Sequence, residues 1–129
     1  MTERRLVSSG SPYESAFGYS RAVVIGDGCW VAGTTDAGPD GRSTHPGDAA
    51  AQARASFEIA LDALERAGFA RGEVVRVRMY VVRAEDAMAV ASVNGELFAA
   101  IRPAATLLRV AGLIDPSLLV EVELEARRA

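Results

Sequence analysis

The segment VEVELEA, residues 120–126, alternates apolar and acidic side chains without interruption. This period of two is typical of a β-strand that buries one face and leaves the other face polar. The apolar residues would contact a hydrophobic core. The acidic residues would then form a row on the opposite face of the sheet: Glu121, Glu123 and Glu125. The C-terminal part of the chain therefore predicts a sheet that is covered by apolar packing on one side.

A second apolar run, Ala105–Leu113, precedes this strand and is separated from Leu118–Ala126 by a break at Asp115-Pro116. We therefore expect two strands joined by a short loop. Matching apolar positions with apolar positions sets their register. It predicts that three residues of the first strand share the face of the glutamates: Ala105, Leu107 and Arg109.

In that register Arg109 would pair with Glu121 or Glu123 across the two strands. Two interpretations remain open. The charged face is either a solvated surface with one ion pair, worth about 0–1 kcal/mol, or a partly buried site. Isolated charges on a strand face are often simply exposed to water.

Local signals divide the rest of the chain into strands and helices. Asp48 can cap the start of a helix and Gly68 can end it in a left-handed conformation. We expect helices at Asp48–Gly68 and Glu85–Ala99, and strands at Arg5–Ser9, Tyr19–Ile25, Cys29–Thr34 and Val74–Val82. This order predicts an α+β fold, in which a mixed sheet carries two helices on one face.

The strand Val74–Val82 places Arg76, Arg78 and Tyr80 on one face, opposite its valines and Met79. This polar face and the row of glutamates could form one continuous surface. Arginine and aromatic residues are enriched in protein interfaces. We therefore expect that this side of the sheet mediates oligomerisation.

Composition limits the possible functions. The chain has 129 residues, which fits one domain over residues 1–129, and its net charge of −3 comes without a basic stripe, which argues against nucleic-acid binding. One cysteine and one histidine allow neither an internal disulfide nor a Cys/His zinc site. The sequence shows neither a secretory leader nor an apolar run long enough to span a membrane, so we expect a cytoplasmic protein.

Four segments together resemble the Rid family (YjgF-type, also labelled L-PSP endoribonuclease-like): GYSRAVVIGDGCWVAGTT, AAQARASFEIALDALERAG, EVVRVRMYVV and RPAATLLRVAGLIDPSLLVEVELEA. The resemblance implies a chorismate-mutase-like fold and a homotrimer, whose sheets form an inner barrel with three clefts between subunits. It also implies a small-molecule ligand. Deaminases of this family hydrolyse enamines or imines to keto acids and ammonia without a metal or organic cofactor.

The resemblance also assigns candidate site residues. Glu121 matches a last-strand glutamate that is associated with the attacking water, and Ala32 stands where deaminases usually have serine. The implied ligand-binding positions are Tyr19, Ala32, Gly33, Asn94, Ala105, Leu107 and Arg109.

The departure from the family pattern lies at Ala105, where the deaminases carry an arginine that holds the substrate carboxylate, and at Leu107, where they often carry cysteine. Arg109 is about 13 Å along the strand and Arg102 about 10 Å in the other direction, so neither is a simple replacement. The cleft would therefore be more apolar, and its ligand neutral or larger than a 2-imino acid. The sequence is consistent with an imine hydrolase that uses Glu121 and water, or with a non-catalytic metabolite-binding protein. The negative net charge and the single histidine disfavour a ribonuclease.

Overall fold

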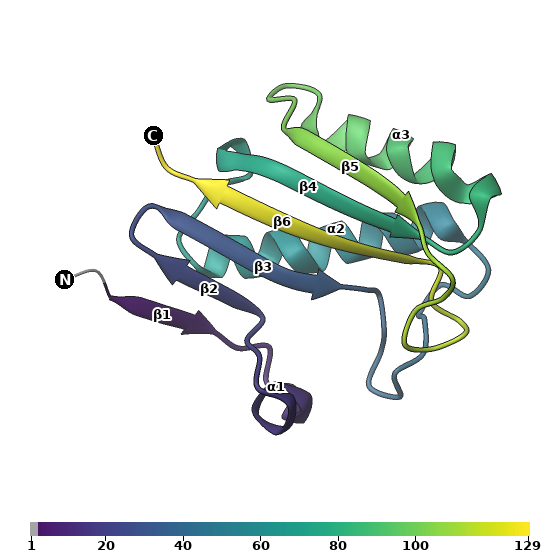
Figure 1. The fold of residues 1–129 in the computed structure, drawn as a ribbon, viewed down its shortest axis with the longest axis horizontal. Helices are drawn as coiled ribbons and strands as arrows, with labels where there is room; N and C mark the ends of the chain where they lie inside the picture. Colours follow the sequence, from purple (N-terminus) through teal and green to yellow (C-terminus); the bar gives the residue numbers. More distant parts are fainter. Residues whose placement is uncertain (1–2) are drawn as a thin grey trace.

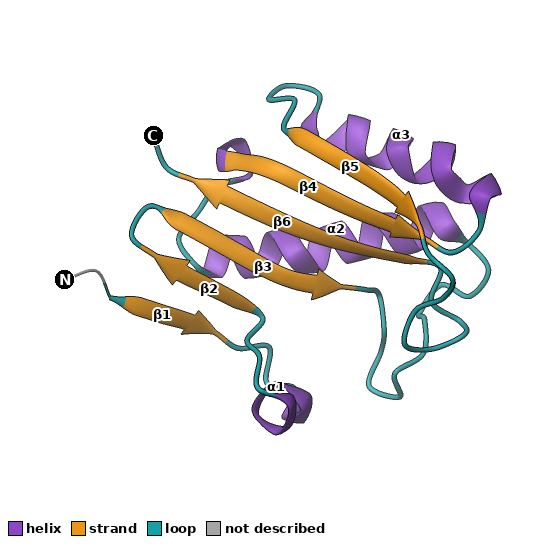
Figure 2. Cartoon of the chain, viewed as in Figure 1, coloured by secondary structure: helices purple, strands orange, loops and turns teal. Residues whose placement is uncertain are grey.

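The computed structural model describes residues 3–129 as a six-stranded mixed sheet with two long helices against one face (Figures 1 and 2). The strands are β1 Arg4–Val7, β2 Ala22–Ile25, β3 Gly28–Thr34, β4 Val74–Val81, β5 Ala104–Arg109 and β6 Val120–Arg127. The helices are α1 Pro12–Phe17, α2 Ala49–Arg66 and α3 Ala87–Phe98, with short 3-10 turns at Arg71–Glu73 and Ala84–Asp86. The predicted α+β architecture with α2 and α3 on one face is confirmed.

The strand order is β1-β2-β3-β6-β4-β5, so the C-terminal strand lies in the middle of the sheet. Strands β4 and β5 are parallel, and every other neighbouring pair is antiparallel. The prediction that β5 and β6 are neighbours is therefore wrong. Parallel strands need a long crossover connection, and α3 provides it between β4 and β5. Residues 110–119 then carry the chain past β4 to its other side (Figure 1).

This topology also corrects the predicted faces of β5. Ala105, Leu107 and Arg109 are register partners of core residues of β4, namely Val77, Met79 and Val81. The three β5 residues therefore belong to the face that α2 and α3 cover, and not to the face of the glutamates. Arg109 does not pair with Glu121 or Glu123, and its Nε donates to the carbonyl oxygen of Val82 at 3.4 Å.

The hydrophobic core lies between the sheet and helices α2 and α3. Phe57 of α2 and Phe98 of α3 pack edge to face, with ring centroids 5.7 Å apart, and both side chains are fully buried. Helix α2 forms as predicted, because the Asp48 side chain accepts a hydrogen bond from the Ala51 N–H at 3.0 Å. Gly68 follows the helix with a φ of 91°, a conformation that glycine adopts without strain.

Several local features differ from the sequence prediction. Between the first two strands, where no helix was predicted, lies α1, which begins with Ser11 as its N-cap and Pro12 in its first turn. A β-bulge between Val74 and Arg76 leaves Val75 exposed instead of in the core. The core positions of α3 are Val90, Val93 and Phe98, and Met88 is exposed on its outer side. Among residues 3–129, no helix combines the length and the apolar character that crossing a membrane requires.

Candidate functional site

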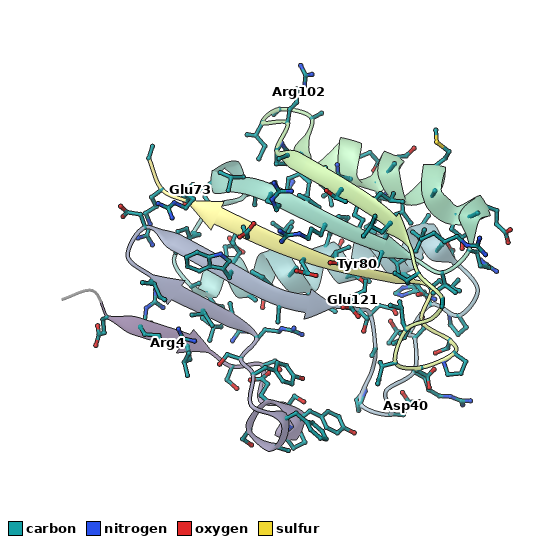
Figure 3. All side chains as sticks on the ribbon, viewed as in Figure 1. Arg4, Asp40, Glu73, Tyr80, Arg102 and Glu121 are labelled. Carbon is teal, nitrogen blue, oxygen red and sulfur yellow. The ribbon has the colours of Figure 1, made fainter. Side chains whose placement is uncertain are left out.

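The face of the sheet that points away from α2 and α3, here called the open face, carries the polar side chains of its central strands. Strand β4 aligns with β6 so that each polar residue of one strand meets a glutamate of the other: Arg76 with Glu125, Arg78 with Glu123 and Tyr80 with Glu121. Figure 3 shows Tyr80 and Glu121 near one another on neighbouring strands. The two polar faces recognised in the sequence are therefore one surface.

Two of the three glutamates of β6 are held by neighbouring side chains. The Tyr80 hydroxyl donates to Oε1 of Glu123 at 2.5 Å, and this hydrogen bond is the main cause of the raised pKa of Tyr80. The indole Nε1 of Trp30 donates to Oε1 of Glu125 at 2.8 Å. Arg78 lies 3.8 Å from Glu123 and 3.7 Å from Glu125. The carboxylates of Glu123 and Glu125 therefore link neighbouring strands on the open face through hydrogen bonds and ion pairs.

Glu121 is different. Within residues 3–129, its carboxylate makes no hydrogen bond and no ion pair. Burial raises the pKa of Glu121 and the charge of Glu123 raises it further, whereas the positive charge of Arg21 acts in the opposite direction. A carboxylate that is partly desolvated and unoccupied can accept a proton from water. Glu121 is therefore the strongest candidate for acid–base chemistry on this face.

Gly33 makes room for the Glu121 carboxylate. The pairing of β3 with β6 shifts between Val31 and Thr34, so that Ala32 and Gly33 together occupy the place opposite Glu123. A Cβ atom at position 33 would overlap Oε2 of Glu121. The β-bulge and the missing side chain therefore bring the backbone of β3 against this carboxylate, an arrangement found frequently next to active sites.

Arg21 also reaches this place, although the sequence analysis did not select it. Its Nη2 donates to the carbonyl oxygen of Gly33 at 2.6 Å, and its Nε is buried without a hydrogen-bond partner. A signal was available in the sequence, because the expected strand Tyr19–Ile25 places alternate residues on one face. Arg21 therefore shares the open face with Tyr19 and Val23.

A groove of about 600 Å³ lies beside these residues on the open face. Its walls come from α1, from the first three strands and from β6, and they include Tyr19, Trp30, Ala32 and Glu123. Two of the predicted ligand-binding residues, Tyr19 and Ala32, thus line the groove. Gly33 and Glu121 do not line it, but Ala32 is the chain neighbour of Gly33, and Glu123 lies two residues from Glu121 on β6.

The other predicted ligand-binding residues lie elsewhere in the chain. Asn94 is on α3, behind the sheet, and its Oδ1 is buried without a partner. Ala105, Leu107 and Arg109 are on β5, separated from β6 by β4. One chain therefore brings together Glu121 and Gly33, with Tyr19 and Ala32 beside them, but not these four residues. In the described residues, no group of three or more His, Cys, Asp or Glu side chains could hold a metal ion.

Comparison with known proteins gives a consistent set of relatives. The family described as Endoribonuclease L-PSP matches residues 10–128. The structure of Rv2704 from Mycobacterium tuberculosis, described as a member of the YjgF/YER057c/UK114 family, is 43% identical with a TM-score of 0.87, covering 98% of this chain and 100% of that one. The YjgF gene product of E. coli is 26% identical with a TM-score of 0.78, covering 96% and 94%. The uncharacterized protein SCO2049 of Streptomyces coelicolor is 42% identical over 96% of this chain and 92% of its own length.

Proposed function

Because this chain belongs to the Endoribonuclease L-PSP family, the YjgF-type family of its structural relatives, we propose that it hydrolyses a small imine or enamine to a carbonyl compound and ammonia. The observation that carries this proposal is that the Glu121 carboxylate is partly buried and has no hydrogen-bond or ion-pair partner among residues 3–129. Glu121 is the one glutamate of the β6 row that lacks a partner in this part of the chain, and its pKa is raised by burial. A general base near neutral pH has these properties.

The proposed reaction consumes one water molecule. The Glu121 carboxylate takes a proton from water while the water oxygen forms a bond to the imine carbon, and the C=N π electrons move to nitrogen. The tetrahedral carbinolamine then receives the proton from Glu121 on its nitrogen. Glu121 then passes the hydroxyl proton to the nitrogen as the C–N bond breaks and the C=O bond forms, so that neutral ammonia leaves and the carboxylate is regenerated. Glu121 thus acts first as base and then as acid.

We further propose that the working unit is a homotrimer and that the site lies between subunits. The family resemblance suggests this assembly, and the open face supports it, because it exposes aromatic and aliphatic side chains among its charges. A neighbouring subunit would then supply the exposed candidate residues of the edge strand β5 that one chain leaves far from Glu121. These residues are Ala105 and Arg109, whereas Asn94 and Leu107 are packed within their own chain.

Ammonia release tests the proposed activity. Imines derived from a panel of amino acids, with charged and neutral side chains and with the carboxylate free or amidated, would be generated in situ. We expect the wild-type protein to accelerate ammonia release and Glu121→Gln to lose this acceleration by about a hundredfold or more, as for a general base. Glu58→Gln, which changes an exposed carboxylate on α2, is the matched control and should retain full activity.

Two results would contradict the hydrolase. One is activity that survives in Glu121→Gln after repeated purification, and the other is no acceleration with any member of the panel. Thermal stabilisation of the protein by a panel compound without ammonia release would instead identify a metabolite-binding protein that uses the same place.

A further inference from the structure

Arg21 is a cation whose charge is not neutralised within the chain. Among residues 3–129, no carboxylate oxygen lies within 4.0 Å of its guanidinium group. Its Nη2 is fixed to the carbonyl oxygen of Gly33, and its Nε has no partner although it is buried. Leaving a desolvated charge and a buried donor unsatisfied costs free energy, so such groups usually have a counterpart in the functional state.

The carboxylates nearest to Arg21 are not free to serve as this counterpart. Glu14 is buried and accepts hydrogen bonds from both the backbone N–H and the hydroxyl of Ser9. Glu121 influences Arg21 through its charge, but it lies outside ion-pair distance. The hydrogen bond to Gly33 holds the guanidinium in place near Glu121 without joining the two groups. Arg21 therefore presents a positioned, unpaired charge to the same region of the open face.

We propose that Arg21 binds a carboxylate of the ligand on which Glu121 acts. A guanidinium group offers five N–H donors in a planar fork that matches a carboxylate. A phosphate would bring a second negative charge beside Glu121 and Glu123, which disfavours it. Because Arg21 and Glu121 both flank Gly33, the carboxylate and the reacting carbon of the ligand are close neighbours in the molecule.

This proposal rests on the proposed function for the role of Glu121, and it changes the expected substrate. The absence of an arginine at position 105 suggested a ligand that is neutral or larger than a 2-imino acid. With Arg21 as the anion-binding residue, the site selects a ligand that carries a small carboxylate. The arginine then lies just before β2 instead of on β5. Arg21 would thus determine specificity, and Glu121 would carry out the chemistry.

Binding of two stable probes tests the proposal without turnover. Pyruvate carries a carboxylate next to a carbonyl carbon, and pyruvamide is its neutral counterpart of nearly the same shape. We expect the intact wild-type protein to bind pyruvate in calorimetry, and Arg21→Gln to bind it on the order of ten- to a hundredfold more weakly. Pyruvamide binding should be equal in both proteins. Arg21→Lys should recover part of the affinity for pyruvate, because it keeps the charge but loses the fork.

A second readout is the response of the wild-type protein itself. In the wild-type protein, the ¹⁵N-¹H resonance of the Arg21 Nε–H group, assigned by its loss in Arg21→Lys, should shift on addition of pyruvate and not on addition of pyruvamide. Arg71→Gln, a change of an exposed arginine in the turn before β4, is the matched control and should bind pyruvate like the wild type.

The inference is overturned if Arg21→Gln binds pyruvate as tightly as the wild type, if the wild type does not bind pyruvate, or if the Arg21 resonance responds equally to both probes. The outcomes separate it from the proposed function. Arg21-dependent pyruvate binding without any imine hydrolysis would contradict the hydrolase and keep the carboxylate site. Glu121-dependent hydrolysis together with pyruvate binding that is independent of Arg21 would support the hydrolase and contradict the carboxylate site.

Discussion

Gly33 shows how a single missing side chain can define a site. The carboxylate of Glu121 occupies the space that a Cβ atom at position 33 would need, and the carbonyl group of the same residue holds Arg21. One backbone position therefore fixes both the proposed base and the proposed anion-binding residue. At Gly95 in α3, by contrast, a Cβ atom would meet no other atom of the described residues within 4 Å.

Gly33→Ala should therefore reduce activity more than it reduces stability. The new methyl group must displace the Glu121 carboxylate, which is the end of a flexible side chain without a hydrogen bond among residues 3–129, so the cost to folding should stay below the roughly 1–3 kcal/mol of overpacking a rigid core. Urea unfolding would measure the change in free energy, and ammonia release the change in activity. Gly95→Ala is the matched control, which should be stabilising by about 0.5–1 kcal/mol because alanine favours the helix and its Cβ meets no atom within 4 Å. Equal effects of the two substitutions would contradict the role assigned to Gly33.

The ionisation of Glu121 should oppose folding. Its pKa in the folded protein lies above the ordinary value of 4.5, so the folded state binds the proton more tightly than the unfolded state does. The charged form is therefore a cost that is present at neutral pH and is relieved as the pH falls through the folded pKa. Glutamine does not ionise and avoids this cost.

Glu121→Gln should consequently be more stable than the wild type at pH 7, and this difference should shrink as the pH is lowered toward 4.5. Urea unfolding at a series of pH values would measure it. Glu58→Gln, at an exposed position, serves as the reference and should show a much flatter difference. A stability gain of Glu121→Gln that grows as the pH falls would have the wrong sign for this explanation.

At the scale of elements, the sequence predicted structure where the signals were local. Helix α2 has its cap at Asp48 and its end near Gly68, both within a few residues of the element that they delimit. The alternation in β6 likewise reports directly on its two faces. The pairing of β5 was not predictable in this way, because it depends on the crossover through α3, which places β4 between β5 and β6.

In the candidate site, too, the sequence was informative about single positions and uninformative about contacts between distant strands. Glu121 and Gly33 were identified by resemblance, and the structure places them together. Arg21 was missed because alternation within its own strand indicates its face but not its contact with the Gly33 carbonyl oxygen on β3. The face of Arg109 was wrong because it was inferred from a direct β5–β6 pair that does not form.

The buried side chain of Gln52 connects α2 with two loops that flank the end of β3 and the start of β6. Its Nε2 donates to the carbonyl oxygens of His45 at 3.1 Å and Ser117 at 3.0 Å, and its Oε1 accepts from the N–H of Leu119 at 2.8 Å. The side chain is fully buried. The helix thus satisfies backbone groups of both loops in a place that water does not reach.

Gln52→Leu should be strongly destabilising, because each buried group that loses its partner costs about 1–3 kcal/mol. Urea unfolding would measure the loss, and hydrogen exchange should show that the Leu119 amide loses protection. Gln52→Glu keeps an acceptor for Leu119 but removes both donors, so it should protect this amide better than leucine does. Glu58→Leu is the exposed control on the same helix. Unchanged exchange at Leu119 in Gln52→Leu would contradict the proposed connection.

At the scale of the whole molecule, the two faces of the sheet differ in how they are covered. Helices α2 and α3 lie against one face (Figure 2). The open face exposes large side chains from separate strands. Leu6 of β1 is 59% exposed, Trp30 of β3 38% and Leu108 of β5 49%. These residues extend across the open face, together with the charged ladder of β4 and β6. In the proposed homotrimer, a second copy of the chain would cover this open face.

Leu108→Asp tests this assembly together with the location of the site. Leu108 belongs to the open face, since it is the register partner of Tyr80, and it is exposed within one chain, so the substitution should cost little in the stability of the subunit itself. In a trimer that buries this face, however, the new carboxylate would lose its water without gaining a partner. Sedimentation velocity at micromolar concentration should show a trimer for the wild type and smaller species for Leu108→Asp. Met88→Asp, at a position on α3 that is 78% exposed, introduces the same charge on the other side of the molecule and should remain trimeric. If the site lies between subunits, Leu108→Asp should lose imine hydrolysis in parallel with the trimer, whereas a dissociated variant that keeps full activity would place the site within one chain.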